Sequence, residues 1–260
     1  MFPFDKPQYI AMSQDQRIVL DIAAHLGESF LRFIPRKIKN FPSHGLDHSL
    51  NIIKYTNNFI KAWGISLTRD ERFLLYLAAW LHDIGCITVR KNHGVKSAQL
   101  FMKSETLCNY LNSLDHNHLV NLQDIVKSHS SSVKISNVCL KRGKVHTQFI
   151  SSIFRLMDAC EITNFKCPNA VFIEIKNTFK KRQGGITGPD NEALEFWDGH
   201  MNIVDVVFVK PQIEVHVNDR KKCKTIITRL RKEILSVKVT FENSNIEVPK
   251  VVVKTQSSKI

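Results

Sequence analysis

Residues 77–86 read Leu77-Ala78-Ala79-Trp80-Leu81-His82-Asp83-Ile84-Gly85-Cys86, an apolar helix that stops at a glycine. The helix carries an adjacent histidine and aspartate, and the rest of the chain is organised around this pair. Neighbouring side chains on a helix diverge by about 100°, so both can meet one metal ion only near the end of a buried helix. An unpaired buried carboxylate is costly, so the pair needs partners. A helix-terminal salt bridge or cap would also supply them, and the dipeptide alone leaves both interpretations open.

Further candidate ligands recur along the chain. His44 and His48 stand four residues apart, which is one helical turn, and His93 and His129 follow the central pair. Asp158 is another charged residue inside an apolar helical run. Imidazoles and carboxylates without cysteine suit one or two divalent ions, Mn, Fe, Ni, Co, Mg or Zn, with positions left open for water and phosphate.

The order His, His-Asp, His, His, Asp resembles the HD-domain metal-dependent phosphohydrolase superfamily. The four residues that match its defining ligands are His48, His82, Asp83 and Asp158. His93 and His129 fall where members with two metal ions place extra histidines. The ligand set that this resemblance implies is His48, His82, Asp83, His93, His129 and Asp158.

Two features depart from the pattern of relatives. The Gly-Tyr-Pro signature of one subgroup is absent, because His129 is followed by three serines, so cyclic di-GMP is not carried over as the substrate. Cys86 stands where many relatives have a lysine after His-Asp-Ile-Gly, which removes one phosphate contact.

The resemblance also suggests roles in catalysis. Asp83 would bridge two ions that activate a water, and Arg90, in a cationic loop, is the first candidate for contact with a substrate phosphate. His44 would donate a proton to the leaving oxygen or serve as an outer ligand. Each ligand histidine needs an acceptor that fixes its tautomer, and Asp47 and Glu161 are the candidates.

The function expected is therefore a phosphohydrolase or phosphodiesterase that acts on a nucleotide or nucleic acid through metal-activated water. A catalytically silent HD domain that senses nucleotides or binds nucleic acid is the alternative. Within the enzyme class, a single-strand nuclease competes with a hydrolase of small nucleotides.

The charge of the chain bears on its partners. Lysine and arginine outnumber the acidic residues by 37 to 24, and the formal net charge is +13. This balance favours an anionic partner, here a nucleotide or single-stranded nucleic acid. The charges are scattered along the chain, however, so a solvated lysine-rich surface explains them equally well.

Other features of the sequence bear on the compartment in which the protein is found. The six cysteines show no Cys-x-x-Cys pairing and resemble reduced residues of a cytoplasmic protein. The first residues lack the features of a secretory signal, and no apolar run is long enough for a membrane span, so no membrane partner is expected. A homo-oligomer remains open.

The fold predicted is mainly α, with an HD-domain helical bundle over residues 1–199 and a small α+β appendage over residues 200–260. Ser13 and Thr68 have the sequence context of helix N-caps. The appendage is predicted as β-β-α-β-β, with strands at 203–209, 212–217, 237–241 and 248–253 and a basic helix at 219–235.

Overall fold

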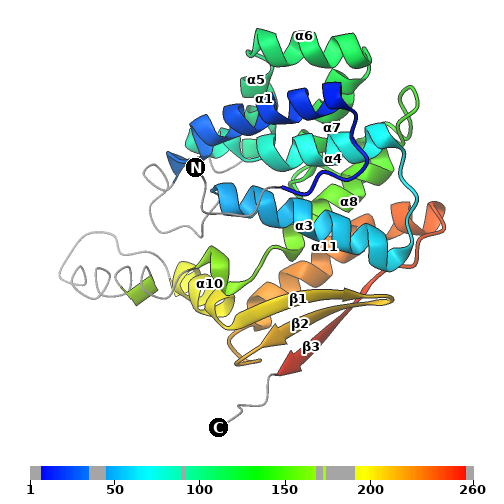
Figure 1. The fold of residues 1–260 in the computed structure, drawn as a ribbon. Helices are drawn as coiled ribbons and strands as arrows, with labels where there is room; N and C mark the ends of the chain where they lie inside the picture. Colours follow the sequence, from blue (N-terminus) through cyan, green and yellow to red (C-terminus); the bar gives the residue numbers. More distant parts are fainter. Residues whose placement is uncertain (1–6, 35–44, 89–91, 168–171, 174–190, 256–260) are drawn as a thin grey trace.

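The computed structural model describes residues 7–34, 45–88, 92–167, 172–173 and 191–255. Within these ranges the fold is mainly α-helical, as predicted, with a three-stranded sheet near the C-terminal end (Figure 1). The helices before the sheet are α1 (Gln14–Leu31), α3 (Leu46–Trp63), α4 (Arg69–Leu81), α5 (His93–Phe101), α6 (Glu105–Leu114), α7 (His118–Ser128), α8 (Thr147–Cys160) and α10 (Asn191–Met201), with short 3₁₀ turns η1 (Ile84–Ile87), η2 (Ile135–Asn137) and η3 (Asn164–Lys166).

The predicted helix starts are confirmed by their caps. The Ser13 hydroxyl accepts a hydrogen bond from the Gln16 backbone, and the Gln16 side chain accepts one from Ser13 in return. Thr68 and Glu71 form the same reciprocal pair at the start of α4. Local sequence therefore sets where α1 and α4 begin.

Helix α4 lies at the centre of the bundle. Residues 73–81 are all buried, and the helix contacts α1, α3, α7 and α8. A helix that is covered on every side must be apolar all round, which is the property that the sequence of this segment shows. The burial of α4 therefore brings its C-terminal end, with His82 and Asp83, into the interior.

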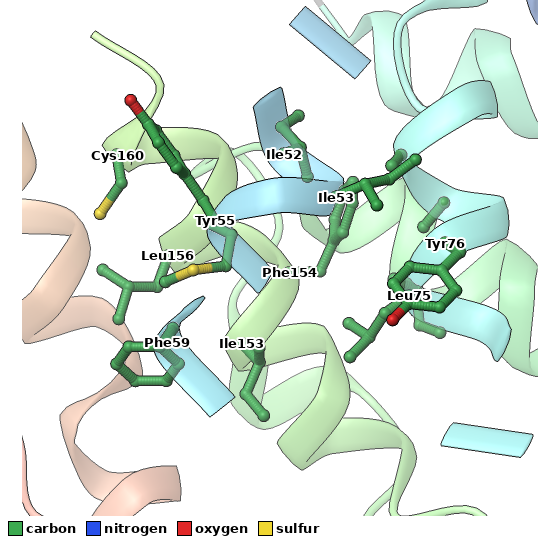
Figure 2. Close-up of a cluster of buried hydrophobic side chains, with 14 of the residues drawn as sticks. Ile52, Ile53, Tyr55, Phe59, Leu75, Tyr76, Ile153, Phe154, Leu156 and Cys160 are labelled. Carbon is green, nitrogen blue, oxygen red and sulfur yellow. The ribbon is translucent and has the colours of Figure 1, made fainter. Parts of the chain in front are cut away.

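The hydrophobic core continues up to this end of α4. Figure 2 shows side chains of α3, α4 and α8 meeting, with Phe59, Leu75 and Phe154 among them. The ring of Phe154 stands edge-on to His82, with 5.3 Å between the ring centroids. The core thus packs directly against one of the predicted metal ligands.

The sheet follows the helical part of the chain. Strand β1 (Ile203–Val209) pairs antiparallel with β2 (Gln212–Val217), and β2 pairs in parallel with β3 (Lys250–Thr255). The first two strands have the predicted bounds, and the last begins two residues later than predicted. Helix α11 (Lys224–Asn243) connects β2 to β3 and packs against α8 (Figure 1).

The predicted strand at 237–241 is wrong, because these residues belong to α11. Their alternating apolar and polar residues mimic a strand, yet Val237 and Phe241 are buried while Val239 is 65% exposed. A strand would place all three on one face. Buried residues recur at intervals of three and four from Leu230 through Ile234 to Phe241, so the helical period overrides the β-branched composition.

The observed order at the C-terminal end is therefore β-β-α-β. The buried core runs without interruption from α1 to α11 among the described residues. The division of the chain at residue 200 stays a prediction. No helix within the described ranges combines the length and the hydrophobicity needed to cross a lipid bilayer.

Candidate metal centre

The ends of five helices bring the six predicted ligands together. His48 lies in the first turn of α3, His93 is the first residue of α5, and Asp158 lies in the last turn of α8. His82 and His129 are the residues that cap the C-terminal ends of α4 and α7. Asp83 follows His82 and precedes η1.

Two imidazoles and one carboxylate form the first part of the cluster. The Nε2 atoms of His48 and His82 are 3.1 Å apart. Asp158 Oδ1 lies 3.2 Å from His48 Nε2 and 3.7 Å from His82 Nε2. These three donor atoms can surround one ion.

Two further histidines form the second part. The Nε2 atoms of His93 and His129 are 2.7 Å apart. Asp83 Oδ1 lies 3.1 Å from the former and 3.9 Å from the latter. The other carboxylate oxygen, Oδ2, lies 3.5 Å from His48 Nε2 and 3.3 Å from His82 Nε2. Asp83 therefore stands between the two parts and presents one oxygen to each.

The hydrogen bonds of the histidine Nδ1 atoms determine which tautomer each ring adopts. Nδ1 of His129 lies 2.6 Å from the carbonyl of Val126, and Nδ1 of His82 lies 3.2 Å from the carbonyls of Ala78 and Ala79. A carbonyl only accepts, so each Nδ1 donates its hydrogen and leaves a lone pair on Nε2. This tautomer is the form of imidazole that binds a metal.

Electrostatics distinguishes two of the histidines. Burial, together with the imidazoles of His82 and His93, lowers the pKa of His129 to about 4, so this ring is neutral at pH 7. Burial and the Lys166 ammonium act to lower the pKa of His48, but hydrogen bonds with carboxylates of Asp158 and Glu161 outweigh them and raise it to about 9. A cation bound at Nε2 of His48 would replace that proton.

Glu161 contacts His48 at Nδ1, the ring nitrogen that faces away from the cluster. Its Oε2 accepts from His48 Nδ1 at 2.9 Å, and its Oε1 accepts from the amide of Asn51 at 3.1 Å. Lys166 Nζ lies 3.2 Å from Glu161 Oε2. Burial alone would raise the pKa of Glu161, but Lys166 and His48 hold it at about 2, so the carboxylate stays charged.

Glu161, predicted as an acceptor, contacts His48. Asp47, the other predicted acceptor, has a side chain that is exposed to solvent. Lys166 is not among the predicted site residues, because nothing in the sequence distinguishes it from the many other lysines and its position has no regular spacing to the ligands.

Two glycines and a serine bring η1 and α5 to the centre. A Cβ atom on Gly85 would lie 2.3 Å from the carbonyl oxygen of His93, and one on Gly94 would lie 2.9 Å from the His129 ring. Ser97 Oγ accepts from the backbone of Gly85 at 2.8 Å and donates to the carbonyl of His82 at 2.5 Å. These close approaches fix the His-Asp turn against α5.

Arg155 fixes the end of α7 from the other side. The side chain is buried and donates to the carbonyls of Ser128, Ser130 and Val133, which surround the position of His129. Nη1 also lies 3.3 Å from Ser236 Oγ of α11. A buried guanidinium that satisfies several carbonyls holds the C-terminal end of a helix in one place.

Cys86 lies beside the cluster, with its thiol 3.7 Å from Asp83 Oδ1. Burial and the neighbouring carboxylates raise the pKa of this thiol, so it stays protonated at neutral pH. The thiolate is the form that binds metals. Cys86 Sγ nevertheless lies with donor atoms of Asp83 and His93 in a group that could hold a metal ion, and a bound metal would lower the pKa of this thiol.

Two side chains of the cluster are partly exposed. Side chains of His93 and Asp158 are 21% and 24% exposed, whereas those of His48, His82, Asp83 and His129 are buried. His44 and Arg90, predicted as a proton donor or outer ligand and as a phosphate contact, lie outside the described residues.

The donor set fits divalent cations. Nε2 of His129 presents a lone pair to Nε2 of His93 at 2.7 Å, so either a hydrogen on His93 or a cation lies between the two nitrogens. The centre combines imidazole nitrogens with carboxylate oxygens, a set that suits Mn, Fe, Co, Ni or Zn. The structure thus brings the six predicted residues together, and their role as ligands stays a prediction.

The family model described as HD-CE matches residues 30–236, which is most of the chain and includes every residue of the cluster. No curated protein matches the chain.

Proposed function

The chain belongs to the HD-CE family, which has an HD-type domain, and from this membership we propose that it is a metal-dependent phosphohydrolase. The observation that carries the proposal is the division of the cluster into two parts with Asp83 between them. When bound at such a centre, divalent ions polarise a phosphoryl oxygen and lower the pKa of water to about 7.

The residues of the chain support this chemistry in distinct ways. Val126, Ala78 and Glu161 accept from Nδ1 of His129, His82 and His48, so Nε2 of each of these three rings faces the centre. The partial exposure of His93 and Asp158 gives a phosphoester a route to it. Buried walls on the other sides keep bulk water away, which strengthens electrostatic interactions.

The substrate proposed is a phosphoester of a nucleotide or of a single-stranded nucleic acid. The net charge of +13 supports an anionic substrate. In this proposal Arg90 contacts the phosphate, and His44 protonates the leaving oxygen or acts as an outer ligand. The proposed cofactor is one or two divalent ions.

Elemental analysis of the purified protein tests the proposal. We expect about two ions per chain, about one in His129→Ala and almost none in Asp83→Ala, because Asp83 serves both parts of the cluster. His116→Ala is the control, since this side chain is 87% exposed and lies outside the cluster. Retention of both ions by Asp83→Ala would contradict the assignment.

Activity is tested separately, with bis(p-nitrophenyl) phosphate as a simple phosphodiester in the presence of manganese. Hydrolysis that is lost in Asp83→Ala and retained in His116→Ala supports the enzyme. Bound metal without turnover on this ester, nucleotides or oligonucleotides would instead indicate a binding module.

A further inference from the structure

A groove runs along the exposed side of α3, close to the metal centre. It consists of two adjoining hollows of about 540 and 530 Å³, which share Asn51, Lys54, Asn58 and Phe165 in their linings. Spacings of three and four residues place the first three on one face of α3. Asp205 of β1 lies in the wall of the first hollow.

Phe165 lines both hollows. Phe165 is 73% exposed, whereas most of the other phenylalanines in the described ranges are buried. The ring stands on η3, the turn that also carries Lys166 to Glu161. The turn η3 therefore carries both the exposed ring of Phe165 and Lys166, which forms an ion pair with Glu161 beside the metal centre.

A second link connects the groove to the centre. Asn51 lines both hollows and donates to Glu161 at 3.1 Å, and Glu161 accepts from the ligand histidine His48 at 2.9 Å. One carboxylate and one imidazole therefore separate the groove from the donor atoms of the centre. The groove therefore adjoins the side of the centre formed by Glu161 and His48, whereas the partly exposed side chains of the cluster are His93 and Asp158.

The chemistry of the lining matches the parts of a nucleotide. An exposed aromatic ring offers a surface on which any nucleobase can stack. Asparagine amides both donate and accept, as base edges require, and carboxylates such as Asp205 accept from ribose hydroxyls. Lys54 and Lys61 supply ammonium groups, and neither forms an ion pair with another of the described residues. This mixture does not suit a purely apolar ligand.

We propose that the groove binds a nucleotide unit, with its base on Phe165 and its phosphate at Lys54 or Lys61. The inference deepens the proposed function and rests on it, since the unit is a part of the proposed substrate outside the metal centre, and the phosphoester to be hydrolysed is a different one from the phosphate at Lys54 or Lys61. Free nucleotides and single-stranded nucleic acid share this unit.

Binding measured without turnover tests the groove. The probe is a fluorescein-labelled single-stranded oligonucleotide in buffer with EDTA, followed by fluorescence anisotropy, with a fluorescent mononucleotide as the second probe. We expect Phe165→Ala to weaken binding of at least one probe by about tenfold or more, because loss of base stacking has that effect. Phe165→Trp should retain the affinity.

Leu140→Ala is the matched control, because Leu140 is 70% exposed and lies outside the groove. It should bind as the unchanged protein does. Equal affinity of Phe165→Ala and the control, or binding of neither probe by the unchanged protein, would overturn the proposal. Circular dichroism checks that each variant is folded.

Two further readouts identify the source of the unit and separate the two proposals. Binding of the oligonucleotide that mononucleotides do not displace, and that weakens steeply with salt, indicates a strand, whereas tight binding of the mononucleotide indicates a free nucleotide. Bis(p-nitrophenyl) phosphate carries no nucleobase, so its hydrolysis by the unchanged protein and by the Leu140→Ala control tests the metal centre separately from the groove. If no protein hydrolyses this ester while the nucleotide probes still bind, the proposed phosphohydrolase activity is wrong and the proposed nucleotide groove stands.

Discussion

Glu161 shows how a single residue outside the ligand set determines the state of the centre. It is the only one of the described residues that contacts His48 Nδ1 with a carboxylate, and it also holds Lys166 and Asn51. Groups that orient a ligand histidine and raise its basicity contribute strongly to metal affinity.

Glu161→Gln should weaken metal binding by about 10- to 100-fold. The amide retains the size of the side chain but not its charge, so the partly buried Lys166 ammonium, 3.5 Å from His48 Nδ1, loses its nearest ion-pair partner. Competition with a chelating dye measures the affinity for manganese.

Glu71→Gln is the control for this prediction. Glu71 is also buried, and it also accepts from a histidine, His146 Nδ1, at 2.8 Å, but it lies outside the metal cluster. The control should lose stability and keep its metal affinity. Equal affinities for the two variants would show that Glu161 does not orient His48.

Helix α11 shows why amino-acid composition is a weak guide to secondary structure. Its residues 237–241 are rich in β-branched side chains and alternate like a strand, yet they extend a helix whose buried positions lie three or four residues apart. Packing of that stripe against α8 decides the outcome, because tertiary contacts override β propensity.

Two substitutions in this segment test the helical assignment. Val237→Ala should lower the free energy of unfolding by roughly 1.5–3 kcal/mol, because it removes buried methyl groups and leaves a cavity. Val239→Ala should change it by less than about 0.5 kcal/mol, because Val239 is 65% exposed. Urea unfolding measures both. Equal losses would favour a strand, in which the two positions share a face.

The pH dependence of stability belongs to the whole molecule, and His200 contributes to it. The ring is buried at the end of α10, and its Nδ1 donates to the carbonyl of Ile162 at 2.8 Å. Burial, aided by the Lys166 ammonium, lowers the pKa of His200 to about 4 from an ordinary value of 6.5. As the pH falls, the unfolded chain therefore takes up the proton first.

Stability should accordingly fall between about pH 6.5 and pH 4, with about 3 kcal/mol of the loss due to His200. His200→Asn keeps a donor near the position of Nδ1 and does not titrate. We expect it to lose less stability than the unchanged protein over this interval, as measured by urea unfolding at several pH values. Parallel pH profiles for the two proteins would contradict the prediction.

The sequence by itself determined the helix starts, the central apolar helix and the identity of the six clustered residues. These features depend on local chemistry: Ser13 and Thr68 cap their own helices, and an apolar run that contains His82 and Asp83 must be buried with partners for the pair. The order of the histidines and aspartates then carried the family resemblance.

Only the tertiary structure decided how these residues are arranged. Asp83 faces both parts of the cluster because Gly85 and Ser97 fix its turn against α5, and Lys166 reaches Glu161 from a turn with no regular spacing to the ligands. The course of α11 and the groove beside Phe165 likewise depend on contacts between segments far apart in the chain. Such contacts depend on packing in three dimensions, and periodicity along the sequence reports only which side of an element is buried.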